Sequence, residues 1–562
     1  MEIKDFDNRE FEERADYIDF SDLISWTVQT SFFEKIQRKI IERGAKLIVG
    51  PRGTGKTHQF RHAYYSCLND VTKPLPLYIS FGKYYHLEPL LFKSANALNV
   101  FHTWILAKIA NEIFEISNTL EIEISIYFKE VNIEQIDLSD FIQNAEKNLI
   151  NSSNDELISK LSIQRIIGVI DELLIHTKRK RCILLLDDAA LTLTPDYMVE
   201  FFDVFRSLKT QNISPKASVY PGTTQYGPRF HIGQDAEEVS AWLNVEDENY
   251  SEFMAEILNK RLNITNVNSD IIEIFKFASF GIPRAFITLL RAFIQTDSKT
   301  TQQKFNKVIE NQKNLLEKEY LSLSLKLPQY KSIIKIGSDF FDKIVGEVLE
   351  ANKLNPEEKK THLGILQDNL VLKSSRMMKF LIEAGLLYEL QSVGDGTDRV
   401  FNRYMPHYLF LINAKVFTHS KGFNPKSIIE SINKKTEKRP IRKQLNTILN
   451  ATQIENLKLD LPSCSKCGVP RMAEEQKFCH NCGNPLIGQS TFEATLKIKI
   501  KDLPLPKWQI DVILKDTKLK NIEDIYTSQN LAKDLKNAKG IGKVRTTNID
   551  TLVKELLEEF LA

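Results

Sequence analysis

The eight residues 50–57 have the types and spacing of a phosphate-binding loop. They follow a short apolar run, Lys46–Val49, and precede a segment at 58–68 with helical character. Three glycines let successive backbone N–H groups turn inward toward an anion, and the positive end of the following helix faces the same point. In such a loop the lysine contacts the β- and γ-phosphates and the next hydroxyl ligates Mg²⁺. The sequence therefore predicts an ATP and Mg²⁺ site built from Gly50, Pro51, Arg52, Gly53, Thr54, Gly55, Lys56 and Thr57.

An acidic pair ends a second apolar run further along the chain. Four consecutive apolar residues at 183–186 predict a strand buried in a parallel sheet, and Asp187 and Asp188 follow it directly. A carboxylate at this point reaches the hydration shell of Mg²⁺, so we assign Asp187 to the metal. Asp188 is placed to orient and deprotonate an attacking water, as an ATPase requires. A buried strand that ends in a solvated acidic turn is the alternative interpretation.

These two motifs and a later Gly281-Ile282-Pro283-Arg284 together resemble the AAA+ ATPases. More narrowly, they resemble the clade of the origin-recognition/Cdc6-like and STAND ATPases, over about residues 11–293. The resemblance implies a helical lid and places Arg284 in the role of the lid arginine that contacts the γ-phosphate. It also implies a polar sensor residue after a strand expected at 217–220, where Thr224 is the candidate and Thr223 the alternative.

Three further features bear on the resemblance. Arg229 is either an arginine finger acting in trans in a homo-oligomer or a plain surface arginine. Asp188 is one methylene shorter than the glutamate common in fast AAA+ ATPases, which favours slow, switch-like hydrolysis, although STAND-type members often carry paired aspartates. The span between the loop and the acidic pair is longer than usual, which predicts a helical insertion.

A chain of 562 residues exceeds what one hydrophobic core sustains, so we expect a multidomain α/β protein. A helix at 376–384, followed by strands on either side of the turn-rich residues 394–398, has the order of a winged helix. In chain order we expect a helical lead-in at 1–44, a P-loop ATPase core at 45–243 with an insertion at about 86–180, a helical lid at 244–318, a winged-helix-like domain at 319–418, a basic linker at 419–461, a zinc ribbon at 462–488 and a helix-hairpin-helix-like domain at 489–562.

Four of the six cysteines form two Cys-x-x-Cys-Gly knuckles. Two close pairs of thiolates suit tetrahedral Zn²⁺, and the glycine after each pair permits the tight turn that aims backbone N–H groups at sulfur. A redox dithiol is the competing interpretation, but paired knuckles favour a metal. The module resembles short zinc ribbons, and its predicted ligands are Cys464, Cys467, Cys479 and Cys482.

Residues 535–549 resemble a helix-hairpin-helix motif. In that family a glycine-containing hairpin opens a helix whose N-terminal amides contact a DNA phosphate, and nearby cations add affinity without sequence choice. Helix-hairpin-helix folds also serve as docking modules for proteins, so the motif is compatible with either DNA or a protein as its partner. The predicted DNA-contacting residues are Lys539, Gly540, Gly542, Lys543 and Arg545.

The overall composition restricts where the chain can act. The 75 Lys and Arg residues nearly balance 73 Asp and Glu residues, so any basic surface for nucleic acid must be local. No apolar stretch is long enough to cross a bilayer, and the acidic N-terminus is no signal peptide. The cysteine usage fits a reducing compartment, so we expect a cytoplasmic protein without a membrane partner.

Together these features favour an ATP-binding and ATP-hydrolysing AAA+-like switch that acts on double-stranded DNA. The basic residues between 434 and 443 add electrostatic support. Two alternatives belong to other classes. One is a STAND-type signalling or defence ATPase that oligomerises when it senses a ligand, and the other is a nucleotide-dependent scaffold for a separate effector protein.

Overall fold

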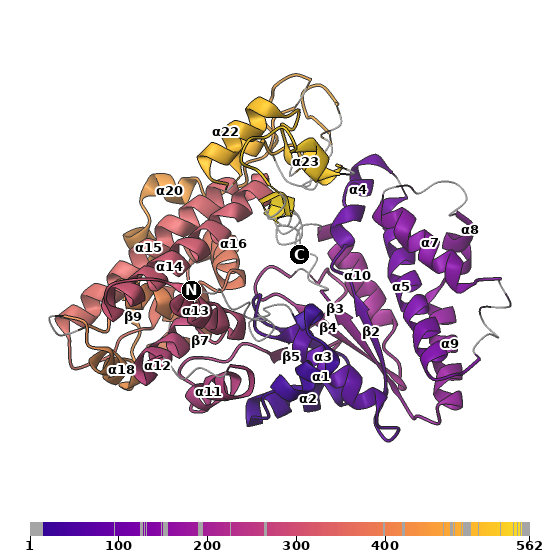
Figure 1. Cartoon of the computed structure of the whole chain (residues 1–562), viewed down its shortest axis with the longest axis horizontal. Helices are drawn as coiled ribbons and strands as arrows, with labels where there is room; N and C mark the ends of the chain where they lie inside the picture. The colour runs from indigo at the N-terminus through magenta and orange to yellow at the C-terminus, as the bar shows by residue number, and fades with distance from the viewer. Residues whose placement is uncertain are drawn as a thin grey trace.

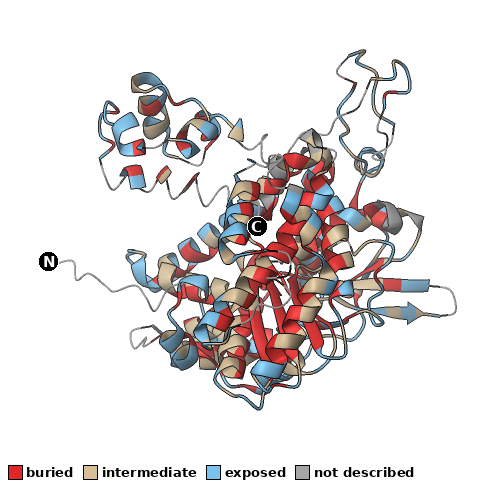
Figure 2. Ribbon diagram, turned by 90° about the vertical axis from the view of Figure 1, so that its right-hand side faces the viewer, coloured by how far each residue is buried: buried red, intermediate tan, exposed pale blue. Residues whose placement is uncertain are grey.

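The computed structural model describes most of the chain between residues 15 and 553 (Figure 1). Buried residues fill the centre of the molecule, in the sheet and in the helices around it (Figure 2). None of the described helices is both long and apolar enough to span a lipid bilayer. Within 15–553 the description omits residues 95, 124–127, 129, 131, 148, 150–154, 189–194, 225, 263–266, 397–398, 419–421, 465, 473–475, 477, 485, 487–495, 504, 529, 543–544, 548 and 551.

A five-stranded parallel sheet forms the centre of the first domain, in the order β2-β3-β4-β1-β5. Alternate residues of β3 pack on opposite faces: Ile183 and Leu185 lie in one core cluster, and Leu184 and Leu186 in another. Both faces are therefore covered, as parallel sheets require, and the predicted α/β fold class is confirmed. The strands are β1 (Lys46–Val49), β2 (Leu75–Ser80), β3 (Cys182–Asp187), β4 (Ile213–Val219) and β5 (Glu237–Ser240).

Helices α2 and α3 cover one face of this sheet, and helices of the insertion cover the other. The insertion joins β2 to β3, and its helices stand together at the right of Figure 1. Its longest helix, α5, packs against β2, α7, α9 and α10. These elements are α1 (Phe20–Trp26), α2 (Ser31–Ile41), α3 (Lys56–Leu68), α4 (Leu90–Lys93), α5 (Ala97–Thr119), α7 (Gln135–Glu146), α8 (Asp155–Lys160), α9 (Ile163–His176) and α10 (Pro195–Ser207), with single turns at Ala15–Tyr17 and Tyr84–Leu87.

Three helices after β5 form a lid: α11 (Tyr250–Arg261), α12 (Ser269–Ala278) and α13 (Pro283–Gln295). The turn before α13 leaves no room for a side chain at Gly281. This residue has φ +78°, and a Cβ there would lie 2.1 Å from the carbonyl oxygen of Leu243. The indole N–H of Trp242 donates to the carbonyl oxygen of Phe280 at 2.7 Å, which fixes the same turn. The start of α13 is therefore held against the segment that leaves β5.

The second domain shares one continuous hydrophobic core with the lid. Its four-stranded sheet has the order β7-β8-β6-β9, and β7 and β8 form the antiparallel hairpin that the sequence predicted after a helix, α16. The sequence did not predict β6, which pairs with β8. The elements are α14 (Thr301–Lys326), a turn at Pro328–Tyr330, α15 (Lys331–Leu354), β6 (Leu363–Leu366), α16 (Asn369–Glu383), β7 (Leu387–Asp395), β8 (Arg399–Pro406) and α17 (Tyr408–Asn413).

The segment expected to be a basic linker differs from that expectation, because most of it packs on the second domain. Strand β9 pairs in parallel with β6. Two of its basic side chains are held by acids: Arg442 lies 3.0 Å from Asp395 and Lys443 lies 2.6 Å from Glu347. A three-residue strand carries no periodicity that sequence analysis can detect. The segment comprises α18 (Pro425–Asn433), β9 (Ile441–Lys443), α19 (Leu445–Ile448) and α20 (Ala451–Glu455).

The last described part of the chain is a small helical domain with its own core. Its segments are joined near the start by a bridge between Lys499 and Asn521. Figure 1 shows α22 and α23 together at the top of the molecule. The elements are a turn at Ile500–Asp502, α22 (Lys507–Asp516), α23 (Ile522–Tyr526) and α24 (Leu531–Asp534).

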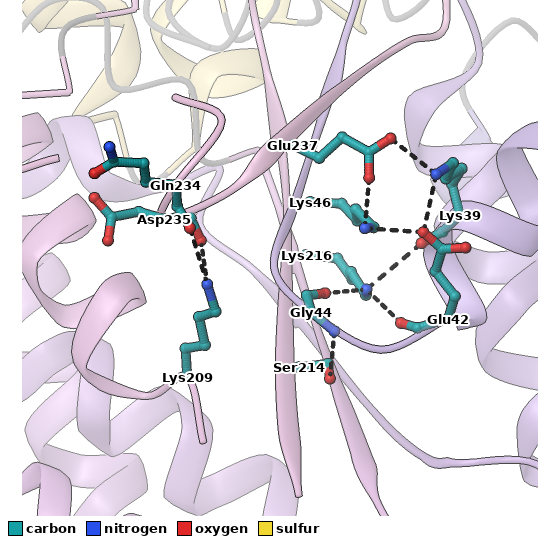
Figure 3. A network of polar contacts seen from close by, with 10 residues as sticks. All are labelled: Lys39, Glu42, Gly44, Lys46, Lys209, Ser214, Lys216, Gln234, Asp235 and Glu237. Carbon is teal, nitrogen blue, oxygen red and sulfur yellow. Dashed lines mark hydrogen bonds and ion pairs between the residues drawn. The ribbon is translucent and has the colours of Figure 1, made fainter. Parts of the chain in front are cut away.

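A charged network holds the end of the sheet that lies opposite the phosphate-binding loop (Figure 3). At the start of β1, Lys46 contacts Glu237 of β5 at 2.6 Å and Glu42 at 2.9 Å. The fully buried Lys216 of β4 donates to the carbonyl oxygens of Glu42 and Gly44. Burial, together with the charge of Lys46, lowers the pKa of Lys216 to about 6. The network therefore ties the loop before β1 to its two neighbouring strands.

We expect Gly281→Ala to destabilise the protein by about 2–4 kcal/mol, because the new Cβ adds an overlap with a backbone oxygen to the cost of a left-handed φ. Gly233→Ala is the matched control: its φ is +89° with no atom within 4 Å, so only the backbone cost of about 1 kcal/mol applies. Thermal unfolding of both variants measures the difference. Equal losses would contradict the close contact at Leu243.

Candidate functional site

The loop 50–57 joins the end of β1 to the first turn of α3. Gly53 and Gly55 have φ of +85° and +87°, and Gly55 is the last residue before the helix. Gly53 also contacts the lid: a Cβ there would lie 2.9 Å from side-chain atoms of Ile282 and Arg284. The backbone N–H of Arg284 donates to the carbonyl oxygen of Gly53 at 3.3 Å. Loop and lid are thus already in contact at the glycine where a side chain would separate them.

Lys56 is the first residue of α3, and its ammonium group turns back onto the loop. It donates to the carbonyl oxygens of Gly50 at 2.6 Å and Pro51 at 3.1 Å, and lies 4.5 Å from the centre of the Tyr220 ring. Burial lowers the pKa of Lys56 to about 8, against the opposing effect of Asp187 and Asp188. An anion in the loop would replace the two carbonyl oxygens as acceptor and would favour the charged lysine.

Asp187 ends β3 and is almost completely buried. One carboxylate oxygen accepts the hydroxyl of Ser218 at 2.6 Å and the backbone N–H of Asp188 at 3.0 Å. The other accepts the hydroxyl of Tyr78 at 2.9 Å. Ser218 and Tyr78 come from β4 and β2, the two neighbours of β3, so three adjacent strands fix this carboxylate. Such a rigid, hydrogen-bonded carboxylate fits a Mg²⁺ ion held through the water of its hydration shell.

Asp188 follows in a left-handed conformation, with φ +51°. Its carboxylate accepts the hydroxyl of Ser80 at 3.1 Å, and its backbone N–H donates to the hydroxyl of Ser218 at 3.0 Å. Burial, and then the charges of Asp187 and Asp16, raise the pKa of Asp188 to about 7. A carboxyl with this pKa can accept a proton near neutral pH, as a general base must.

A cavity of about 620 Å³ lies over the carboxyl ends of β2, β3 and β4, where open α/β sheets bind ligands. Lys56, Thr57 and Arg52 of the loop line it, with Asp188 and, from the lid, Arg284. Its apolar part lies between the first helices and the lid and suits a flat apolar group. The side chains there include Trp26, Val28, Phe33, Phe253, Ile257 and Ile287.

Neither of the two sensor candidates, Thr224 and Thr223, lines the cavity. The Thr224 hydroxyl donates to the carbonyl oxygen of Tyr220 at 2.7 Å. Ser218 and Tyr220, at the end of β4, do line the cavity. Sequence analysis missed Ser218 because this serine lies inside β4, where no sequence pattern marks it. Only the structure shows that its hydroxyl donates to Asp187 and accepts the backbone N–H of Asp188. Arg229 lies outside the cavity lining, 3.5 Å from Asp203, with 73% of its side chain exposed.

The four predicted zinc ligands form one cluster, with all sulfur atoms within 4.8 Å of one another. The shortest separations are 3.6 Å between Cys464 and Cys482 and 3.5 Å between Cys467 and Cys479. A tetrahedral zinc with bonds of about 2.3 Å places its sulfur ligands about 3.8 Å apart, so the cluster fits the ion. Backbone N–H groups lower the pKa of Cys464 and of Cys467, which favours the thiolate form that binds metal, whereas burial and the neighbouring thiols raise the pKa of Cys482.

The two knuckles repeat the same backbone pattern. Gly468 donates its N–H to the carbonyl oxygen of Cys464 at 2.8 Å, and Gly483 donates to that of Cys479 at 2.9 Å. Both glycines have a left-handed φ, of +72° and +66°. This repetition is typical of a site shaped around a metal, because each turn aims its N–H groups at a sulfur.

The hairpin with the predicted DNA contacts lies in the small C-terminal domain. Gly540 has φ +86°, Ile541 is buried, and Lys539 and Gly542 are exposed. The guanidinium of Arg545 donates to the carbonyl oxygen of Gly540 and lies 5.0 Å from the centre of the Trp508 ring, so it also holds the turn. Lys543 lies outside the described residues.

Comparisons with known proteins give structural matches only. The sequence matches no family model, and no curated protein matches it. The Aeropyrum pernix ORC1 protein in complex with DNA is similar over 68% of this chain and 91% of its own, at 12% identity and a TM-score of 0.29. The Aeropyrum pernix ORC2 protein, in ADPNP–ADP complexes, is similar over 76% of this chain and 96% of its own, at 12% identity and a TM-score of 0.34. At this identity and TM-score, the assignment of the sites rests on the residues of this chain.

We expect the buried Asp188 carboxyl to lower the free energy of unfolding of the nucleotide-free protein as the pH rises from about 4 to about 7, whereas the buried Lys216 and Lys56 act in the opposite direction. The unfolded Asp188 carboxyl releases its proton near pH 4, whereas the folded one keeps it to about 7, so folding is favoured by proton uptake between these values. Asp188→Asn removes this dependence and should stabilise the protein at pH 8 by roughly 1–4 kcal/mol. The free energy of unfolding of the native protein and of Asp188→Asn, each measured at pH 5 and pH 8, gives this contribution. Asp511→Asn, at an exposed position, is the control. A similar change in both variants would contradict the burial of Asp188.

We expect the purified protein to contain about one zinc ion per chain, as measured by mass spectrometry of the metal. Cys467→Ser should lose the ion, because three thiolates hold zinc far more weakly than four. His480→Ala alters the same module without removing a thiolate and should keep full occupancy. The melting of the sheet domain should be unchanged in both variants, since the cysteine cluster lies outside its core. Zinc retained by Cys467→Ser would contradict the four-cysteine site.

Proposed function

We propose that the chain is an ATP-binding switch of the AAA+ kind, which hydrolyses ATP slowly and acts on double-stranded DNA. One observation carries the proposal: Lys56, Asp188 and Arg284, from three separate segments, line a single cavity at the carboxyl end of the sheet. A phosphate-binding loop alone indicates only that a phosphate is bound. The added carboxylate and lid arginine supply a base and a second cation, which hydrolysis of a bound nucleotide requires.

Each residue has a separate task in the proposed reaction. Lys56 leaves the carbonyl oxygens of Gly50 and Pro51 and contacts the β- and γ-phosphates. The Thr57 hydroxyl and the Asp187 carboxylate hold Mg²⁺, which when bound neutralises charge on the phosphates. Asp188 accepts the proton of the attacking water, and Arg284 contacts the γ-phosphate from the lid. Slow turnover follows from the length of Asp188, because its side chain is one methylene shorter than glutamate and holds the attacking water less well.

Contacts between the loop, the lid and the second domain are the proposed route from the nucleotide to the rest of the chain. Gly385, at the end of α16, packs against both partners: a Cβ there would lie 3.3 Å from Ile282 of the lid and 3.7 Å from Pro51 of the loop. The ring of Tyr388 in β7 lies 4.6 Å from that of Trp242. A nucleotide that moves the loop or the lid therefore also moves α16 and the hairpin that follows.

The charge around the hairpin supports DNA as the partner. Residues 533–545 contain five Lys or Arg residues and one Asp, a net charge of +4, whereas the whole C-terminal domain, 489–562, carries only +2. Local positive charge of this kind binds phosphate backbones without sequence choice. Lys539 and Gly540 are exposed at the hairpin, where the lysine and the adjacent backbone can approach one phosphate.

A nucleotide-dependent scaffold is the second candidate function. The raised pKa of Asp188 favours it, because a protonated carboxyl cannot act as the base. If Asp188 stays protonated with Mg·ATP bound, the protein binds ATP without turning it over and acts by assembly alone. A STAND-type signalling ATPase would differ in its trigger, since a ligand other than duplex DNA would drive assembly.

We expect the purified protein to hydrolyse ATP slowly and duplex DNA to raise the rate. Lys56→Ala should abolish ATP binding, and Asp188→Ala should keep binding but lower turnover by about 10²-fold or more, as loss of a general base does. Nucleotide binding by calorimetry and phosphate release, each with and without duplex, measure these effects.

Lys539→Glu tests the DNA contact, with Lys35→Glu on α2 as a control for the same change of charge elsewhere. We expect only the first to weaken duplex binding and DNA-stimulated turnover. ATP binding without turnover in either the native protein or Asp188→Ala would favour the scaffold. If the protein hydrolyses ATP but neither binds duplex DNA nor changes its rate when duplex is added, the proposed role on DNA is overturned.

A further inference from the structure

One charged group in the cavity comes from the helical insertion and has no part in the proposed reaction. Lys108 of α5 lines the cavity together with Glu146, the last residue of α7. The insertion therefore forms a wall of the nucleotide cavity. The ammonium of Lys108 lies 5.0 Å from the centre of the Trp104 ring, and 18% of its side chain is exposed. Burial lowers the pKa of Lys108, and the charges of Glu146 and Asp188 oppose that effect.

Glu146 is shared by two lysines, and neither contact is tight. Its carboxylate lies 3.5 Å from Lys108 and 3.8 Å from Lys83, which follows β2 and is 68% exposed. Strong charge-assisted hydrogen bonds are about 2.7–2.9 Å long, and such pairs occur elsewhere in this protein, as between Lys46 and Glu237 at 2.6 Å. Lys108 can therefore leave Glu146 at small cost, because Lys83 still compensates the carboxylate.

The position of Lys108 relative to Asp188 indicates which part of a nucleotide it would meet. Lys108, Lys56 and Asp188 line the same cavity, and the chain just after β2 links the surroundings of Lys108 to Asp188. A Cβ at Gly82 would lie 3.3 Å from the Asp188 carboxylate, and the next residue, Lys83, shares Glu146 with Lys108. Asp188 is the group assigned to the water that attacks the γ-phosphate, so a cation on this side of the cavity faces that phosphate and not the base. ATP adds negative charge at this end of the cavity that ADP does not have.

We propose that Lys108 is a γ-phosphate-contacting residue, supplied by the helical insertion, which leaves Glu146 when ATP binds and returns to it when only ADP is present. The inference rests on the proposed function, since it places a triphosphate in the cavity. It gives the insertion a role in distinguishing the two nucleotides. It also makes the end of α7 sensitive to hydrolysis, because Glu146 gains or loses a partner at that step.

Equilibrium binding of ATP and of ADP to the full chain, measured by calorimetry with Mg²⁺, tests the proposal. Lys108→Met removes the charge and keeps an unbranched side chain over Trp104. We expect this variant to bind ATP about tenfold or more weakly and ADP within twofold of the native protein, as loss of one charged contact predicts. Lys108→Arg should restore most of the preference for ATP. Glu146→Gln should strengthen ATP binding and leave ADP unchanged, because it frees Lys108.

Lys83→Met removes the other partner of Glu146 and should weaken ATP binding more than ADP binding, because Glu146 then holds Lys108 more strongly. Lys35→Met on α2 is the matched control, since Lys35 is exposed and does not line the cavity, and it should leave the ratio of the two affinities unchanged. A ratio unchanged in Lys108→Met, or equal weakening of ATP and ADP, would overturn the role of Lys108. The proposed function would survive that result if the native protein binds ATP and Lys56→Ala does not. Failure of the native protein to bind either nucleotide would overturn both.

Discussion

The buried carboxylate of Asp187 is the constraint on which the nucleotide cavity depends. A buried charge is tolerated only when hydrogen bonds replace the water it loses, and here the donors come from Tyr78 on β2 and Ser218 on β4. These bonds are possible only in one register, in which Ser80 lies beside Asp187 and Ala217 beside Leu186. A shift of one residue would turn each donor to the opposite face of the sheet. The alignment of three strands, and with it the floor of the cavity, is therefore tied to a single side chain.

The phosphate-binding loop, 50–57, contacts both the lid and the second domain. Its carbonyl at Gly53 accepts the backbone N–H of Arg284, in the first turn of α13, and its Pro51 lies next to Gly385 of the second domain. Both contacts are close because glycine stands where a side chain would intervene. Packed interfaces of this kind move between discrete arrangements and do not deform gradually. A change at the phosphates is therefore expected to reach the hairpin of the second domain through rigid contacts, without a flexible connection.

Sequence analysis located what is encoded locally and missed what depends on distance in space. The strand before the loop was predicted with its observed bounds, and the strand ending in the acidic pair to within one residue, because short apolar runs next to glycine and aspartate carry strong signals. Ser218, Tyr78 and Lys108 carry no such signal, since each acts through a neighbour far along the chain. Thr224 was chosen from its position after β4, but the residues that line the cavity there are Ser218 and Tyr220. The β9 strand is too short to show a period and forms only because β6 offers an edge.

Burial in the cavity disfavours the charged forms of two groups that the proposed reaction needs. Burial lowers the pKa of Lys56 to about 8 and raises that of Asp188 to about 7, so each group resists the charge that catalysis needs. A bound phosphate favours the charged lysine, and Mg²⁺ favours the charged carboxylates nearby. In the proposed reaction, Mg·ATP would favour the charged forms of both groups, and the effect would be largest on Asp188, whose pKa of about 7 leaves it partly protonated at neutral pH. Lys56 and Asp188 line the same cavity as Arg284 of the lid and Lys108 of the insertion, so a nucleotide that favours their charged forms also meets both of these segments. A ligand that interacts differently with two arrangements of these segments would shift the protein between them.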